Sequence, residues 1–212
     1  MGVMGAMETV EDDVDLLDRW CAGDRAAGNA LFDRYFRLVY RFFEHKRNID
    51  SDIDELVQDT FLGCLRSREA ARRANSFRAY LFGIARHTLY HYWRKRNTRG
   101  EEVDFEQTSI ASLSTSAGSR IDRRQRHARL LDALRGLPLE QQLMLELSYW
   151  EDLEREQLAE VFEIEPATTR SRQFRARQAL RERLDHSADG PRLDDADFDA
   201  WTRTLRRRSD LK

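Results

Sequence analysis

Apolar residues recur at helical spacing along most of this chain, which predicts an all-α protein. The first such stretch is Val14 to Asn48, where a break at Gly23 predicts two helices, the second beginning near Ala26. The residues expected to turn inward are Leu16, Leu17, Trp20, Leu31, Tyr35, Leu38, Val39, Phe42 and Phe43. Strand signals are nearly absent, and ten glycines and three prolines are too few for the turns of an all-β design.

Two further helices are predicted in the first half of the chain. One spans Asp52 to Ser67, with inward residues Ile53, Leu56, Val57, Phe61, Cys64 and Leu65. The other spans Phe77 to Arg96, with Ser76 placed to cap its first turn. Between them, Arg66 to Asn75 is polar and basic and is expected to be a connector.

The sequence changes character after the helix that ends at Arg96. From Thr98 to Ile121 it is rich in Ser and Thr, carries an acidic cluster and shows no sustained period. Helical pattern resumes at Arg123 and runs with breaks to Leu184. We therefore expect two small all-helical domains joined by a flexible linker: a domain at 12–97, the linker at 98–122, a domain at 123–185 and a C-terminal tail at 186–212.

The second domain carries a helix-turn-helix pattern, Glu154 to Arg183, whose second helix begins at Pro166. One side of that helix can pack on a core through Thr169, Ala176, Leu180 and Leu184. The opposite side carries Arg170, Ser171, Phe174, Arg175 and Gln178. An exposed Phe between Arg and Ser is costly unless covered, and a DNA major groove would cover it, with Arg reading guanine and Phe packing on a thymine methyl. The alternative is a basic surface helix in a bundle.

The helix predicted at Phe77 to Arg96 has five basic residues, six aromatic residues and no acid. One half of its surface carries Tyr80, Gly83, His87, Tyr90, His91 and Arg94. Rings for stacking beside imidazoles and a guanidinium suit single-stranded nucleic acid. The alternative is a polar face whose tyrosines contact another part of the protein. His87 and His91 have the i, i+4 spacing of a zinc motif, but Thr88 stands where a general-base Glu is needed, which disfavours a zinc protease.

An acidic face is predicted on the helix at Asp52 to Ser67. Its outward residues are Asp54, Glu55, Gln58, Asp59 and Leu62. Such a face is usually only solvated. The apolar Leu62 among the acids favours a protein partner with a basic docking surface.

Composition excludes several classes of protein. The net charge of −2 does not by itself indicate nucleic acid, but the charges are unevenly distributed. Cys21 and Cys64 lie far apart beside apolar residues and predict buried thiols in a reducing cytoplasm. Neither a transmembrane-length apolar run nor a signal peptide is present, so a soluble cytoplasmic protein is expected. Without a nucleophile–base pair, metal constellation or phosphate loop, we expect no enzyme and no cofactor.

Two segments in this order resemble bacterial sigma factors. DELVQDTFLGCL (54–65) with SFRAYLFGIARHTLYHYWRKR (76–96) is similar to sigma region two. LPLEQQLMLELSYWEDLEREQLAEVFEIEPATTRSRQFRARQAL (137–180) is similar to sigma region four. With only these two regions and a short linker, residues 12–184 resemble the extracytoplasmic-function group of sigma factors.

The resemblance implies partners and roles. Core RNA polymerase would be bound through the clamp helices of its largest subunit by Asp54, Glu55, Gln58, Asp59 and Leu62, and through its flap. The connector would capture a flipped base of the minus-ten element of promoter DNA, and the melted strand would contact Asn75, Tyr80, His87, Tyr90, His91 and Arg94. The minus-thirty-five element would contact Thr168, Arg170, Ser171, Phe174, Arg175 and Gln178. The acidic linker, Glu101 to Glu106, would thread the active-site and RNA-exit region, and an anti-sigma factor is a further candidate partner.

Two departures from the family pattern and an unassigned tail remain. The family usually has Asn where His87 stands and Gly where Glu163 stands in the helix-turn-helix turn. A side chain at a turn with positive φ costs about 1 kcal/mol. In the tail, Asp194 to Arg208 predicts either an amphipathic docking helix or disorder. A stand-alone helix-turn-helix regulator and a helical hydrolase are the alternatives to a sigma factor.

Overall fold

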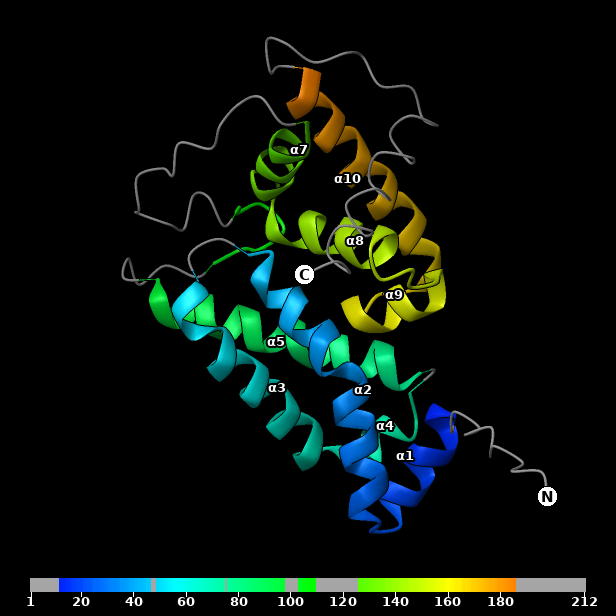
Figure 1. Cartoon of the computed structure of the whole chain (residues 1–212). Coiled ribbons are helices and arrows are strands. Elements are labelled where there is room, and N and C mark those ends of the chain that lie inside the picture. Colours follow the sequence, from blue (N-terminus) through cyan, green and yellow to red (C-terminus); the bar gives the residue numbers. More distant parts are fainter. Residues whose placement is uncertain (1–11, 47–48, 75, 98–102, 110–125, 186–212) are drawn as a thin grey trace, which may run out of the picture.

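The computed structural model describes residues 12–46, 49–74, 76–97, 103–109 and 126–185. Every regular element in these ranges is a helix, which confirms the all-α class. The first domain comprises α1 (Asp13–Cys21), α2 (Arg25–Glu44), a 3-10 turn (Asp50–Asp52), α3 (Ile53–Arg66), α4 (Arg68–Ala71) and α5 (Phe77–Arg96). The second comprises α7 (Arg126–Arg135), α8 (Leu139–Tyr149), α9 (Arg155–Phe162) and α10 (Pro166–Asp185). Figure 1 shows the two domains packed together, with α9 against α5.

Two side-chain caps explain where the longest helices of the first domain begin. Asp24 precedes α2 and accepts hydrogen bonds from two backbone N–H groups of its first turn, at 2.9 and 3.3 Å. Gly23 allows the chain to turn there, because its φ of +104° is rarely adopted by other residues. Ser76 caps α5 by accepting from the N–H of Ala79 at 3.0 Å. Both helix starts confirm the sequence predictions.

Two details of the first domain differ from the sequence predictions. The expected connector at 66–75 contains the short helix α4, which forms where Ala71 is completely buried. Leu65 was expected to turn inward, but its side chain is 46% exposed. It lies in the last turn of α3 at the edge of the apolar stripe, where the buried Cys64 takes the inward position.

One apolar core runs through both domains. The first domain contributes the inward faces of α1, α2, α3 and α5, and the second contributes Leu139, Leu143, Met144, Leu147, Leu153, Leu158, Val161 and Phe162. A smaller cluster joins α7, α8 and α10 through Leu130, Leu134, Leu137, Leu145, Trp150, Ala176 and Leu180. The sequence pattern did not predict the shared core, because helical periodicity shows that a face is apolar but not what covers it.

Part of the linker is built into this core. In the segment at 103–109, which we call the strap, the side chains of Val103 and Phe105 are buried. The carbonyls of Phe105 and Thr108 accept hydrogen bonds from the first two N–H groups of α8, at 3.1 and 3.0 Å, and so satisfy donors that a helix start leaves unpaired. The expected tail helix, Asn75 and the first residues of the acidic linker lie outside the described residues.

A half-buried histidine, His45, lies where the end of α2 meets the second domain. The His45 ring lies 4.8 Å, centroid to centroid, from the ring of Trp150. Its backbone carbonyl accepts a hydrogen bond from Arg135 on α7 at 3.2 Å. Burial lowers the pKa of His45 to about 4. The charged side chains that act on it are Arg41 on α2, Lys46, Arg135 on α7 and Glu146 on α8.

Acid should therefore weaken the contact between the domains. A neutral His45 is favoured in the closed arrangement, whereas a solvated histidine binds a proton near pH 6.5. The resulting loss of stability of the closed arrangement is absent above that pH. It grows to at most about 3 kcal/mol as the pH falls towards 4. We expect the thermal unfolding temperature to fall over this window and His45→Gln to flatten the profile. An identical profile in the variant would contradict the assignment.

Two glycines offer a matched test of the packing. A Cβ at Gly28 would lie 2.4 Å from Cδ1 of Trp20, whereas a Cβ at Gly83 would meet no atom within 4 Å. Gly28→Ala should lower the free energy of unfolding by roughly 1–3 kcal/mol through overpacking. Gly83→Ala should raise it by about 0.5–1 kcal/mol, since alanine favours a helix. Denaturant unfolding measures both, and equal effects would show that α1 does not pack closely on α2.

Candidate nucleic-acid interface

The outward face of α10 has the composition expected of a DNA-reading helix. Thr169, Ala176 and Leu180 are buried, as the helical wheel predicted. The ring of Phe174 is 62% exposed. The remaining predicted contacts on this face are exposed, except the half-buried Thr168: they are Arg170, Ser171, Arg175 and Gln178. The structure thus brings all six predicted residues to one side of the helix.

The turn before α10 takes the strained backbone conformation that usually selects glycine. α9 ends at Phe162, and the next residue, Glu163, has a φ of +54° and a ψ of +43°, which are left-handed. A reciprocal pair of hydrogen bonds between Glu154 and Gln157 fixes the start of α9. The helix-turn-helix geometry is therefore retained although a side chain replaces the glycine.

Contacts across the domain interface accompany this strained residue. One carboxylate oxygen of Glu163 lies 3.1 Å from Nε2 of His87 on α5, and the other lies 3.7 Å from a guanidinium nitrogen of Arg86. Both contacts join the helix-turn-helix turn to α5, and His87 belongs to the face predicted to bind a single strand. These attractive contacts oppose the free-energy cost of the left-handed backbone at Glu163.

The predicted strand-binding residues of α5 divide into exposed and covered groups. His87, His91 and Arg94 are exposed, and Tyr80 is half-buried, with its hydroxyl donating to the Ser67 carbonyl at 2.8 Å. The expected exposure of Tyr90 is wrong, because its side chain is only 6% exposed. The second domain and the strap cover it, which a wheel of α5 alone could not indicate.

A stacked pair of rings carries the contact between the strap and α5. The rings of Tyr90 and Phe105 are 4.2 Å apart and inclined by 18°. The guanidinium of Arg94 lies 5.5 Å from the centroid of the Phe105 ring. The tyrosine hydroxyl donates to Glu140, and burial, reinforced by the charge of that glutamate, raises the pKa of Tyr90. Tyr90 is therefore protonated and engaged on both its ring and its hydroxyl.

Sequence reasoning missed Arg86, which lies at the centre of the interface. Its guanidinium donates to Glu140 at 2.8 Å and to the Val161 carbonyl at 3.2 Å, and lies 5.3 Å from the Phe162 ring. Burial alone would lower the pKa of Arg86, but Tyr90 and Glu140 outweigh burial and raise it. The sequence did contain a signal, because Arg86 stands at a position flanked by inward residues. A buried cation requires an anion nearby, so such an arginine indicates a buried ion pair.

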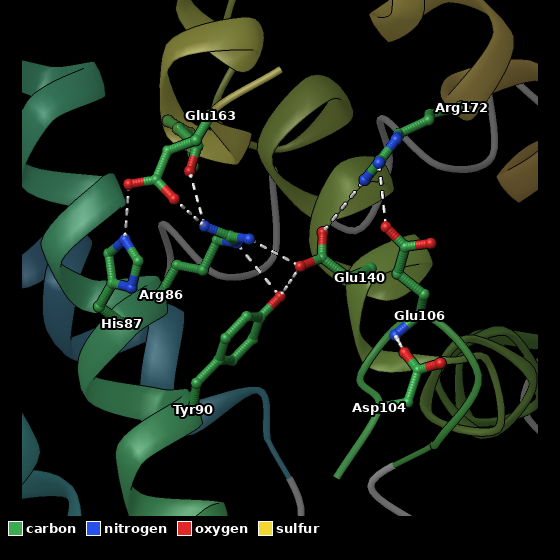
Figure 2. A network of polar contacts seen from close by, with 9 residues as sticks. Arg86, His87, Tyr90, Asp104, Glu106, Glu140, Glu163 and Arg172 are labelled. Carbon is green, nitrogen blue, oxygen red and sulfur yellow. Dashed lines mark hydrogen bonds and ion pairs between the residues drawn. The ribbon is translucent and has the colours of Figure 1, made fainter. Parts of the chain in front are cut away.

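A chain of polar contacts extends from this arginine to α10. Figure 2 shows Glu140 of α8 between Arg86 and Arg172. Arg172 also forms an ion pair with Glu106 of the strap at 2.9 Å, and the N–H of Glu106 donates to Asp104 at 2.9 Å. The network therefore ties α5, α8, α10 and the strap together.

In the ion pairs between the domains, the first domain supplies the basic group and the second supplies the carboxylate. Arg78 of α5 pairs with Glu151 at 2.8 Å, and the buried Lys46 pairs with Glu146 of α8. Burial lowers the pKa of Lys46, and the carboxylate of Glu146 opposes that effect. Together with the pairs of Arg86 and His87, each of these contacts sets a basic group of the first domain against a glutamate of the second. These contacts neutralise Arg78 and Arg86 of α5 within the chain.

The acidic face of α3 lies away from these contacts. Asp54, Glu55, Gln58 and Asp59 are exposed as predicted, and Leu62 is half-buried. Phe36 of neighbouring α2 is 47% exposed, and its ring stacks on that of Phe61 with 6.4 Å between centroids. Because Phe61 belongs to α3, the exposed ring of Phe36 adds apolar surface next to this helix.

The described ranges contain neither a metal site nor a membrane-spanning helix. No group of three or more His, Cys, Asp or Glu side chains in them is placed to hold a metal ion. Among the same residues, no helix combines the length and apolar character that crossing a membrane requires.

Comparison with known proteins agrees with the geometry. The family model for Sigma-70 region 2 matches residues 31–99, and that for Sigma-70 region 4 matches residues 127–180. The chain is 27% identical over 183 residues to the ECF RNA polymerase sigma-E factor of Haemophilus influenzae, covering 81% of this chain and 95% of the relative. It is 29% identical over 151 residues to the RNA polymerase sigma factor HrpL of Pseudomonas syringae, covering 70% and 82%.

A solved structure shares the fold. It is the sigma factor RpoE of Bartonella quintana in complex with the anti-sigma factor NepR, with a TM-score of 0.51, 21% identity, and coverage of 74% of this chain and 94% of that one. Both domains, in the same order, thus have matches among sigma factors. The chain belongs to the extracytoplasmic-function group of RNA polymerase sigma factors.

Proposed function

We propose that this sigma factor divides promoter recognition among three of its helices. The acidic face of α3 docks on core RNA polymerase, α5 holds the melted minus-ten strand, and the outward face of α10 reads the minus-thirty-five duplex. The observation that carries the proposal is the face of α10, where a 62% exposed Phe174 stands among arginines and a serine. Insertion of this face into the DNA major groove would remove the Phe174 ring from water. It would also give the guanidinium groups bases and phosphates to bind.

The role of α3 rests on the chemistry of its surface. Four polar residues and the half-buried Leu62 face outward together, and Phe36 adds an exposed ring at their side. A surface with an apolar centre and an acidic rim suits a basic protein partner, because charge complementarity steers association and apolar burial stabilises it. The clamp helices of the largest polymerase subunit are the partner that the family implies.

The role of α5 requires that its covered residues become accessible. His87, His91 and Arg94 are exposed in the present arrangement and supply hydrogen bonds and charge. Tyr90 is buried by the strap and the second domain and would add a stacking surface only once they move. Asn75 belongs to the same proposed strand-binding set.

The proposed function implies which partners the protein binds and in which cell compartment it works. The protein recruits a polymerase and carries out no catalysis of its own, and it works in the cytoplasm, where the polymerase and promoter DNA are found. The complex of the related fold with NepR supports an anti-sigma factor as a further partner. A stand-alone helix-turn-helix regulator is not favoured, because the first domain also matches a sigma region.

Reconstitution with core polymerase tests the function. Run-off transcription on a pool of genomic fragments should give start sites that core polymerase alone does not use. The double variant Asp54→Arg and Asp59→Arg should lose them, since like charges on the docking surface cost several kcal/mol. Glu156→Arg with Glu165→Arg, which are equally exposed on the second domain, should still co-purify with polymerase. Unchanged co-purification of the α3 variant would contradict the docking assignment.

Arg175→Ala should weaken recognition of the upstream element and leave polymerase binding intact. The side chain is exposed on α10, and loss of one base or phosphate contact costs roughly 1–3 kcal/mol. Gel shift of the holoenzyme on promoters with and without the upstream element measures the effect, and Arg25→Ala, exposed at the start of α2, is the control. Failure of holoenzyme assembly would show that this face has another role.

A further inference from the structure

We infer that Ala167, in the first turn of α10, is a further base-reading residue and that it selects thymine at one position of the minus-thirty-five element. This inference rests on the proposed role of α10 and extends it to the identity of a base. It also sets the place of a second thymine, because Phe174 presents another apolar group on the same face of the helix.

Ala167 belongs to a row of exposed residues that runs along the middle of the outward face of α10. The members of this row are Ala167, Ser171, Phe174 and Gln178. They are spaced by four, three and four residues, so they follow one another along one side of the helix. The buried residues on the opposite side are Thr169, Ala176 and Leu180. A DNA groove that accepts the exposed ring of Phe174 therefore also meets Ala167.

The positive charges of this face lie on the two sides of the row. The row itself contains no charged residue, and Arg170 and Arg175 border it on opposite sides. Neither guanidinium forms an ion pair with a carboxylate of the described residues, whereas Arg172, nearer the core, pairs with Glu106 at 2.9 Å. Phosphate contacts position a protein on the duplex, and contacts to base edges carry the sequence information. The two arginines are thus placed to reach phosphates, and the uncharged row is placed to meet base edges.

The place of Ala167 along the helix favours a base contact. A recognition helix contacts base edges through its N-terminal residues, and Ala167 is the second residue of α10. Its side chain is a single methyl group, which forms no hydrogen bond. In the major groove, thymine is the base that offers an apolar group, its C5 methyl. Contact between the two methyl groups therefore favours thymine over the other bases.

The row also sets the distance between its two apolar contacts. Ala167 and Phe174 are seven residues apart, which is about 10.5 Å along a helix that rises about 1.5 Å per residue. Successive bases of one strand are about 3.4 Å apart along the duplex axis, so a helix that lies along the groove spans roughly three base-pair steps over this distance. Two thymine methyl groups, on either strand, are therefore expected about three base pairs apart.

Replacement of thymine by deoxyuridine tests the inference, because it removes the C5 methyl group and leaves base pairing intact. An upstream element is first selected with the wild-type holoenzyme from a randomised promoter library. Each thymine of that element is then replaced in turn, and holoenzyme binding is measured. Replacement at two positions about three base pairs apart should each weaken binding about fourfold, the effect of returning one methyl group to water. Ala167→Gly should abolish the effect at one position, and Phe174→Ala at the other.

Ala167→Gln gives a second readout, which a purely structural role of the alanine would not produce. The amide of glutamine pairs with adenine, so the preferred base at the position of Ala167 should change from thymine to adenine. Ala26→Gln is the matched control, because Ala26 is the second residue of α2 and is also exposed. It lies outside the DNA-reading helix and should leave every base preference unchanged.

The possible outcomes separate this inference from the proposed function. If the wild-type holoenzyme selects an upstream element, but the two Ala167 variants alter its base preferences no more than Ala26→Gln does, the alanine serves only the helix and the inference is overturned. If the wild-type holoenzyme selects no upstream element, the proposed role of α10 fails as well. Circular dichroism establishes that each variant is folded. Should glycine destabilise α10, the change of preferred base in Ala167→Gln decides the question.

Discussion

The closed arrangement depends on buried cations of the first domain, Lys46 and Arg86, each paired with a glutamate of the second. Removing the Arg86 cation from water is costly, and Glu140 offsets that cost together with Tyr90, the Val161 carbonyl and a carboxylate oxygen of Glu163 at 3.7 Å. The cation belongs to the first domain and the carboxylate to the second, so the interaction that satisfies the charge also holds the domains together. When the domains separate, water takes over both partners. Such a pair gives specificity of arrangement more than net stability.

The rest of the interface follows the same division of charge. The first domain presents cations on and around α5, and the second presents glutamates on α8, in the loop between α8 and α9, and in the turn between α9 and α10. Beneath them, the shared apolar core supplies the main driving force for closure. A nucleic-acid-binding surface is necessarily basic, and leaving it uncovered would expose it to any polyanion in the cell. The carboxylates of the second domain cover part of α5, whereas His91 and Arg94 of its proposed strand-binding set are exposed.

The sequence predicted those features that depend on local pattern. The inward and outward faces of α10 follow from its own period, and the break at Gly23 and the cap Ser76 follow from their neighbours, so these predictions are confirmed. The burial of Tyr90 and the position of Arg86 depend on contacts with Glu140, 50 and 54 positions away, which no local pattern contains. The strap could not be predicted for a related reason. Two apolar residues in a polar linker predict no element by themselves, and their burial depends on the rest of the folded chain.

Glu163 illustrates how a local exception can indicate a distant contact. A side chain in the left-handed region is unfavourable by itself, and nothing within the turn explains its presence. Its partners, Arg86 and His87, belong to the other domain. A residue that departs from local rules is therefore worth examining for a long-range role before it is treated as a tolerated defect.

The distance between the two domains in solution tests the central claim most directly. Spin labels at Ala30→Cys and Glu156→Cys, exposed positions on α2 and α9, can be placed after Cys21→Ser and Cys64→Ala, and measured by pulsed electron resonance. The free protein should give one narrow distance distribution, which lengthens by tens of ångströms in the promoter-bound holoenzyme, as elements roughly 85 Å apart require. A broad distribution in the free protein, or the same distance in both states, would contradict the account.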